Sequence, residues 1–239
     1  MNIERGGLKV MKIAVVYTST TPQLIETIEQ EIHSQLADRP IQLVSYQDPT
    51  ILSDIIAAGA VPPPAAARLV RLYLDAAGDG CQIILSACSS IGDVAAAAQP
   101  LLALMGVPLV RIDQLMAQQA VLASERIAVL ATLPTTMDPT VRLVRQSAAE
   151  TGRPVVIHEA LADGAFGLDP TSFRSLLLKT CAPLLNQVDL ILMAQGSMAY
   201  SETWLHEQTG LPVYSSPRFG ASALRELISE GAFRGGVLV

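Results

Sequence analysis

The chain has 239 residues, of which half are hydrophobic but only 4% are aromatic, and its formal net charge is −6. This acidic balance, with no block of like charges, disfavours a nucleic-acid partner, because phosphate binding needs a clustered basic surface. No uninterrupted apolar run reaches the roughly 18 residues of a membrane helix, so we expect no membrane partner either.

The three cysteines, Cys81, Cys88 and Cys181, are too few for a disulfide framework. The N-terminal residues MNIERGGLKV lack the apolar core of a signal peptide. We therefore expect a cytoplasmic protein whose thiols stay reduced and available for chemistry. Met11 is a second candidate start, because the first strand begins there and residues 1–10 resemble an extension.

Short apolar strands alternate with helical patterns along the chain, which is typical of a parallel α/β core. The expected strands of the first part lie at 11–17, 41–46, 83–85 and 106–111. The expected helices lie at 23–36, 51–58, 65–77 and 92–104, the last interrupted or ended near Pro100.

The same pattern then starts again. Further strands are expected at 126–130, 154–157, 189–193 and 210–214, with helices at 140–151, within 170–186, and from the turn at 195 to 208. Three anchors recur in the same order: KIAVV at 12–16 matches RIAVL at 126–130, Cys88 matches Gln195, and GVPLV at 106–110 matches GLPVY at 210–214.

This repetition indicates an internal duplication. We predict two α/β halves, residues 11–115 joined by the C-terminal segment 216–239, and residues 116–215. A cleft between the halves is the expected ligand site. The C-terminal segment should form a helix from about 219 that returns to the first half.

The turn around Cys88 is the strongest functional signal. The apolar run at 83–85 breaks into small and polar residues, SACSSIGD, before an alanine-rich helix begins. Open α/β sheets place ligands at such strand–turn–helix junctions, outside the carboxyl ends of the strands. Cys88 is therefore a candidate nucleophile or base. Cys81 and Cys181 are interpreted as buried core residues.

Hydroxyl and amide groups at the other strand ends are candidate ligands for a carboxylate, because hydroxyls and backbone N–H groups at helix starts bind anions. Some of these residues could equally serve only as helix caps, and Gln195 could be a structural amide that closes its turn. The histidines lack metal-ligand spacing, so we expect no metal. The candidate substrate contacts are Thr18, Ser19, Ser89, Ser90, Thr132, Thr135, Thr136, Gln195, Gly196 and Ser197, with Arg218 as a further carboxylate contact.

The duplication, the ILSACSS turn, the VLAT strand with its trailing threonines and the DLILMAQGS strand resemble the aspartate/glutamate/hydantoin racemase superfamily. The resemblance covers nearly the whole chain from Met11. It implies two flavodoxin-like halves related by a pseudo-twofold axis, usually one catalytic cysteine in each half, no metal or organic cofactor, and a homodimer or larger homo-oligomer. The family also includes maleate isomerases and arylmalonate decarboxylases.

The resemblance places Cys88 at the first family cysteine and Gln195 where the second is expected. An amide has no useful pKa, so racemisation by two cysteines at these positions is excluded. Three alternatives stay open. Another acid or base could serve the second face of the planar carbanion, or one cysteine could act alone by decarboxylation or by addition to a double bond. In the third alternative the site binds a ligand without catalysis. The groups considered for the second face are Asp113, His158, Glu202, His206, Tyr17 and Tyr200.

The favoured hypothesis is a cofactor-independent isomerase or racemase that acts at the α-carbon of a small carboxylate, with Cys88 as thiolate base or nucleophile. The first alternative is a single-cysteine decarboxylase of a substituted malonate. The second is a non-catalytic protein that binds small carboxylates in the same fold.

Overall fold

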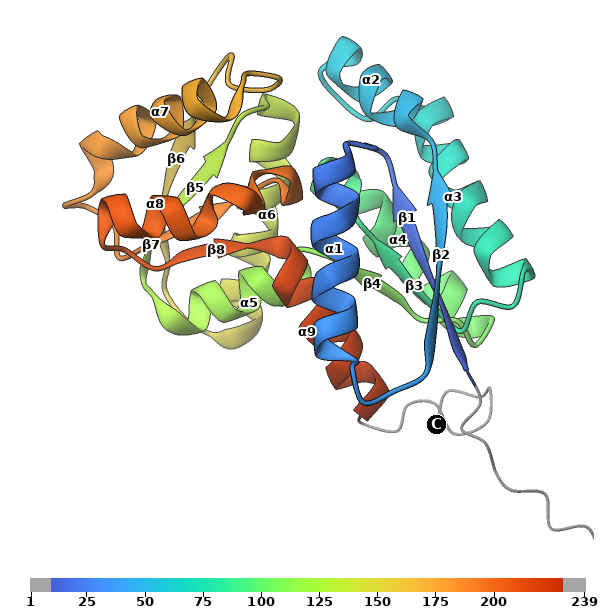
Figure 1. The fold of residues 1–239 in the computed structure, drawn as a ribbon. Helices are drawn as coiled ribbons and strands as arrows, with labels where there is room; N and C mark the ends of the chain where they lie inside the picture. Colours follow the sequence, from blue (N-terminus) through green and yellow to red (C-terminus); the bar gives the residue numbers. More distant parts are fainter. Residues whose placement is uncertain (1–9, 230–239) are drawn as a thin grey trace, which may run out of the picture.

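The computed structural model describes residues 10–229 and contains two four-stranded parallel sheets (Figure 1). The first has the order β2-β1-β3-β4 and the second the order β6-β5-β7-β8, so the second sheet repeats the connectivity of the first. The strands are β1 (Met11–Tyr17), β2 (Ile41–Gln47), β3 (Ile83–Ser86), β4 (Leu109–Arg111), β5 (Arg126–Ala131), β6 (Val156–Leu161), β7 (Leu190–Met193) and β8 (Val213–Ser215). The predicted α/β fold with two similar halves is confirmed.

Helices cover both faces of the first sheet, which explains why its central strands are apolar on both sides. Ile13, Val15 and Tyr17 of β1 pack toward α1 (Pro22–Gln35) and α9 (Ser216–Ser229). The alternating residues Ala14 and Val16 pack toward the opposite layer. That layer consists of α2 (Pro49–Ala58), α3 (Pro63–Gly78) and α4 (Gly92–Leu104).

The second sheet is covered in the same way. Ile127 and Val129 pack with α5 (Gln114–Ala123) and α6 (Pro134–Thr151), whereas Ala128 and Leu130 pack with α7 (Pro170–Cys181) and α8 (Glu202–Thr209). Short 3₁₀ turns complete the chain: η1 (Ser89–Ile91), η2 (Ala182–Leu184) and η3 (Gly196–Ser201). Between residues 10 and 229, no helix is long and apolar enough to cross a membrane.

Two helices cross between the halves. Helix α5 follows β4 of the first sheet but packs on the second sheet, and α9 follows β8 of the second sheet but packs on the first, beside α1 (Figure 1). The two crossing helices also contact each other. Each half therefore contributes a helix to the core of the other. Residues 230–239, the end of the predicted C-terminal helix, lie outside the described residues.

Four details differ from the sequence predictions. Helix α4 continues through Pro100, because this exposed position gives up only one backbone hydrogen bond. Helix α6 begins at Pro134, five positions ahead of the proline expected to start it, because a first-turn proline already has the helical φ. Strand β6 extends beyond the predicted 154–157 and contains His158. Helix α5 occupies a segment predicted only as a boundary between halves.

Candidate active site

The turns after β3 and β7 have matching geometry. Cys88 and Gln195 are each the second residue after their strand, each is extended, with φ/ψ of −141°/120° and −120°/132°, and each precedes a 3₁₀ turn. The preceding alanines make equivalent hydrogen bonds: the Ala87 N–H donates to the Val16 carbonyl and the Ala194 N–H to the Leu130 carbonyl, both at 2.9 Å. The alignment of Cys88 with Gln195 made from the sequence is thus confirmed in space.

Both turns line one small cleft between the halves, with a volume of about 40 Å³. The predicted site residues that line it are Ser19, Cys88, Ser89, Ser90, Thr136, Gln195, Gly196 and Ser197. Apolar side chains complete the walls: Leu24, Leu52, Ala87, Leu133 and Phe166. The sequence analysis missed this apolar set, because a leucine that faces a cleft has no pattern that distinguishes it from a core leucine.

Three predicted contacts do not line this cleft. Thr18 is fully buried next to Cys88. Thr132 lies behind Gln195 and bonds to its side chain. Thr135 lines a neighbouring cavity instead. Because α6 begins at Pro134, Thr135 and Thr136 are consecutive residues of its first turn and face different cavities.

The half-buried Cys88 thiol lies in a mixed electrostatic environment. Burial raises the pKa of Cys88, and this effect outweighs the others. The Thr18 hydroxyl, which has no other partner among the described residues, and the backbone N–H groups of Ser90 and Ile91 lower that pKa, because they lie where they can donate to a thiolate, whereas the negative charge of Asp113 raises it. At neutral pH the thiol is therefore mostly protonated in this conformation.

The Gln195 side chain is held in one orientation. Its Oε1 accepts hydrogen bonds from the Thr132 backbone N–H at 2.7 Å and from the Thr132 hydroxyl at 3.1 Å, and its Nε2 donates to the same hydroxyl at 2.8 Å. The amide thus ties the ends of β5 and β7 together and satisfies a buried N–H. It presents a fixed polar wall opposite Cys88 but no titrating group.

A hydroxyl pair connects the two halves at the cleft. The side chains of Ser90, in η1, and Thr136, in α6, are hydrogen-bonded at 2.8 Å and are both buried. Ser89 is also buried, and its hydroxyl has no partner among the described residues. This hydroxyl is available to a ligand without breaking an existing bond.

The groups considered for a second acid or base lie outside the cleft lining. Asp113 forms a buried pair with Arg111, with Nε–Oδ1 and Nη2–Oδ2 distances of 3.1 and 3.2 Å. Glu202 is bound by Arg218 at 2.9 Å and by the Ser215 hydroxyl, so Arg218 is not available to a substrate there. Neither these carboxylates nor His158, His206, Tyr17 and Tyr200 line the cleft.

Glycine at position 92 makes room for that buried pair. A Cβ at Gly92 would lie 2.1 Å from Nη2 of Arg111 and 2.6 Å from its Cζ. Arg111 therefore crosses directly beside the helix that follows the Cys88 turn. Its charge pairs with Asp113 and does not reach the cleft surface.

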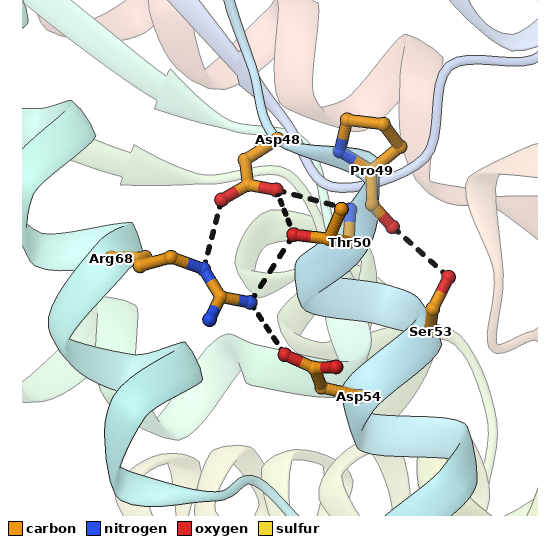
Figure 2. A network of polar contacts seen from close by, with 6 residues as sticks. All are labelled: Asp48, Pro49, Thr50, Ser53, Asp54 and Arg68. Atoms are coloured by element: carbon orange, nitrogen blue, oxygen red, sulfur yellow. Dashed lines mark hydrogen bonds and ion pairs between the residues drawn. The ribbon is translucent and has the colours of Figure 1, made fainter.

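Helix α2 covers the cleft through Leu52 and is anchored by a polar network (Figure 2). Arg68 of α3 donates from Nε to Asp48, the N-cap of α2, at 3.0 Å, and from Nη2 to Asp54 at 2.6 Å and to the Thr50 hydroxyl at 3.3 Å. Asp48 also accepts from the Thr50 N–H. The sequence DPT signals a helix start, but nothing in it indicates that Arg68 is the partner.

Two comparisons with known proteins find matches. The model of the Asp/Glu/hydantoin racemase family matches residues 13–224. The chain belongs to this family. Its membership supports an activity of the racemase or isomerase type. A comparison with curated protein sequences finds no match. Within residues 10–229, no three His, Cys, Asp or Glu side chains are grouped as a metal site requires.

Solved structures of related fold agree with this assignment. An allantoin racemase from Klebsiella pneumoniae is 16% identical, with a TM-score of 0.67, over 92% of this chain and 89% of that one. A glutamate racemase from Bacillus anthracis is 14% identical, with a TM-score of 0.68, over 96% and 85%. A maleate isomerase from Pseudomonas putida is 17% identical, with a TM-score of 0.59, over 95% and 96%. At sequence identities this low, the similarity shows a shared fold.

Proposed function

We propose that this protein is a cofactor-independent isomerase or racemase that acts on a small carboxylate through the Cys88 thiolate. One observation carries the proposal: among the described residues that line the inter-half cleft, Cys88 is the one titratable side chain. Family membership, together with neighbours named as racemases and a maleate isomerase, supports this type of reaction.

Neutral donors would bind the carboxylate, because no charged side chain of the described residues lines the cleft. The Ser89 hydroxyl has no other partner, and Ser19 and Ser197 lie on the same walls. Such donors also stabilise the charge that moves onto the carboxylate when the α-carbon loses its proton. The apolar side chains in the cleft walls lower the local dielectric and so strengthen each of these hydrogen bonds.

A single thiolate is sufficient for two isomerisation routes. As a base, it removes the α-proton, and the C–H electron pair becomes part of an enediolate. Water then protonates the opposite face, which inverts the centre, and the hydroxide left from that water takes the proton back from the Cys88 thiol. As a nucleophile, it adds to a carbon–carbon double bond, and the π pair moves to the carbon next to the carboxylate. Rotation and expulsion of the thiolate then give the other geometric isomer. Both routes return Cys88 to its starting state.

A decarboxylase is the second candidate, and the raised pKa of Cys88 favours it. Loss of CO₂ from a substituted malonate leaves an enediolate that needs one proton on one face. A neutral thiol is the form that donates this proton, and burial stabilises that form. Water then restores the proton to Cys88.

The test is proton–deuteron exchange in D₂O, followed by NMR on a panel of amino acids, hydroxy acids, substituted malonates and unsaturated diacids. We expect turnover by the wild type and by Cys181→Ala, whose thiol is buried in the other half, and none by Cys88→Ala. Loss of a carboxylate carbon would identify the lyase. Tight binding of a carboxylate with no turnover of any panel member would overturn the enzyme hypothesis in favour of a binding protein.

The variant Gln195→Cys tests the missing second acid–base group. It places a thiol at the position equivalent to Cys88, on the opposite wall of the cleft. We expect inversion at the α-carbon to become faster than in the wild type, because a thiol then replaces water as the proton donor on the second face. Gln195→Ser is the matched control, since it removes the same amide without adding a thiol.

A further inference from the structure

A second cavity of about 300 Å³ lies beside the cleft, between α2, α4 and the start of α6. We call it the outer chamber. Its walls include Ile55 of α2, Asp93 of α4, and Thr135, Asp138 and Arg142 of α6. No step of the chemistry described above uses these residues.

The outer chamber and the cleft share one wall residue, Ser90. Ser90 lines both cavities, and its hydroxyl is bonded to that of Thr136, which lines the cleft. Helix α2 covers both, with Leu52 over the cleft and Ile55 at the chamber. Residues three apart share one face of a helix, so a single face of α2 roofs the two cavities.

The two cavities differ in volume, and this difference indicates which part of a substrate each one can hold. The outer chamber, at about 300 Å³, is several times larger than the cleft, at about 40 Å³. The carboxylate end of the substrate is assigned to the cleft. The remainder of any larger substrate needs adjoining space, and the outer chamber supplies it once the Ser90–Thr136 hydroxyls separate to bind the ligand.

The charges of the two cavities differ as well. No charged residue of the described chain lines the cleft, whereas Asp93, Asp138 and Arg142 line the outer chamber. Arg142 Nη2 pairs with Asp93 Oδ2 at 2.6 Å. Within residues 10–229, Asp138 forms no ion pair, so the chamber carries an excess negative charge. The Thr135 hydroxyl is buried and unpartnered among the same residues.

We propose that the outer chamber is a subsite for the distal end of the substrate, and that this end is cationic. The substrate class is then a carboxylate with a basic group several atoms from the reacting carbon, as in a basic amino acid. Asp138 attracts the cation and Thr135 accepts one of its N–H groups. The proposal rests on the function proposed above, because it assumes that the carboxylate end lies at Cys88.

The experiment measures how ligands protect Cys88 from alkylation by iodoacetamide, together with α-proton exchange in D₂O. The ligands are lysine, ornithine and arginine, their neutral counterpart norleucine, and glutamate. In the wild type we expect protection by the basic ligands at lower concentrations than by norleucine. Asp138→Asn should reduce the lysine-to-norleucine affinity ratio about threefold, as for an exposed ion pair, and Asp138→Lys should favour glutamate.

Asp38→Asn is the matched control, because this acid is exposed and distant in sequence from both cavities, and it should leave every ratio unchanged. Equal protection by lysine and norleucine, or a ratio insensitive to Asp138→Asn, would overturn the subsite. If Cys88 variants showed that the enzyme turns over only short neutral acids, the subsite would also be overturned, but the proposed function would stand. Asp138-dependent protection by lysine without turnover of any ligand would support the subsite and contradict the enzyme.

Discussion

At the scale of single residues, the site depends on how differently two equivalent positions are used. Cys88 meets the Thr18 hydroxyl and two backbone N–H groups, whereas Gln195 is bound on its amide by Thr132. The first position can move a proton, and the second holds two strand ends together. The same backbone geometry thus supports a reactive group in one half and a structural group in the other.

The pH dependence of Cys88 reactivity follows from its environment. Burial raises the pKa of Cys88 above the ordinary value of 9.0, so the thiolate fraction, and with it the rate of iodoacetamide alkylation, should continue to rise above pH 9.0. In Thr18→Val the midpoint of the pH–rate curve should move to higher pH, because a donor to the thiolate is lost. In Thr18→Ser, which keeps a hydroxyl, the midpoint should stay at the wild-type pH. A wild-type midpoint below 9.0 would contradict this account.

At the scale of elements, α2 is the helix whose anchoring affects access to the site. It packs mainly on α3, and the Arg68 network joins the two helices (Figure 2). Gly59, with φ of 67°, ends α2 in the left-handed conformation that glycine adopts without strain. Because Leu52 of α2 lines the cleft, the position of α2 affects how easily a ligand reaches Cys88.

Removing the anchor should increase access to Cys88. Arg68→Met breaks the pairs with Asp48 and Asp54, which are partly exposed and therefore individually weak, so alkylation of Cys88 should accelerate by no more than about fivefold. Arg71→Met, on an exposed position of the same helix, is the matched control and should leave the rate unchanged. Equal rates in both variants and the wild type would show that α2 does not limit access.

At the scale of the whole molecule, the crossing helices α5 and α9 hold the halves in the arrangement that forms the cleft. Helix α9 inserts Ala221, Leu224 and Ile228 into the core of the first half although its preceding strand belongs to the second sheet. Helix α9 passes close to Ile112 at Gly220, where a Cβ would lie 2.7 Å from Cγ1 and 3.2 Å from Cα of Ile112. Backbone contact at this distance cannot be relieved by a side-chain rotation.

Gly220→Ala should therefore destabilise the protein by roughly 1–3 kcal/mol, the usual range for an overpacked site. The measurement is the free energy of unfolding in urea. Gly78→Ala is the matched control: it lies at the end of α3, no atom lies within 4 Å of the added Cβ, and it should be neutral or stabilising. A neutral Gly220→Ala variant would mean that α9 adjusts its position without cost.

Local patterns in the chain were sufficient for most elements and for the centre of the site. Buried parallel strands appear as apolar runs, and the duplicated order of strand, polar turn and helix placed Cys88 opposite Gln195 before any coordinates. The prolines at 100 and 139 misled the predictions, because proline is tolerated inside a helix when the lost hydrogen bond is exposed or lies in the first turns. Helix α5 contains the predicted boundary between residues 115 and 116, and the sequence analysis predicts no helix there.

The sequence alone therefore determined the family, the α/β class, the duplication and the candidate catalytic cysteine, because each depends on residues close together in the chain. Only the tertiary structure decided which helices cross between the halves and that Thr135 lines a second cavity. It also decided that Asp113 is paired with Arg111 and that Arg68 anchors α2, the helix that contributes Leu52 to the cleft. These contacts join residues from separate elements, and no local pattern specifies a partner that packing alone brings within hydrogen-bonding distance.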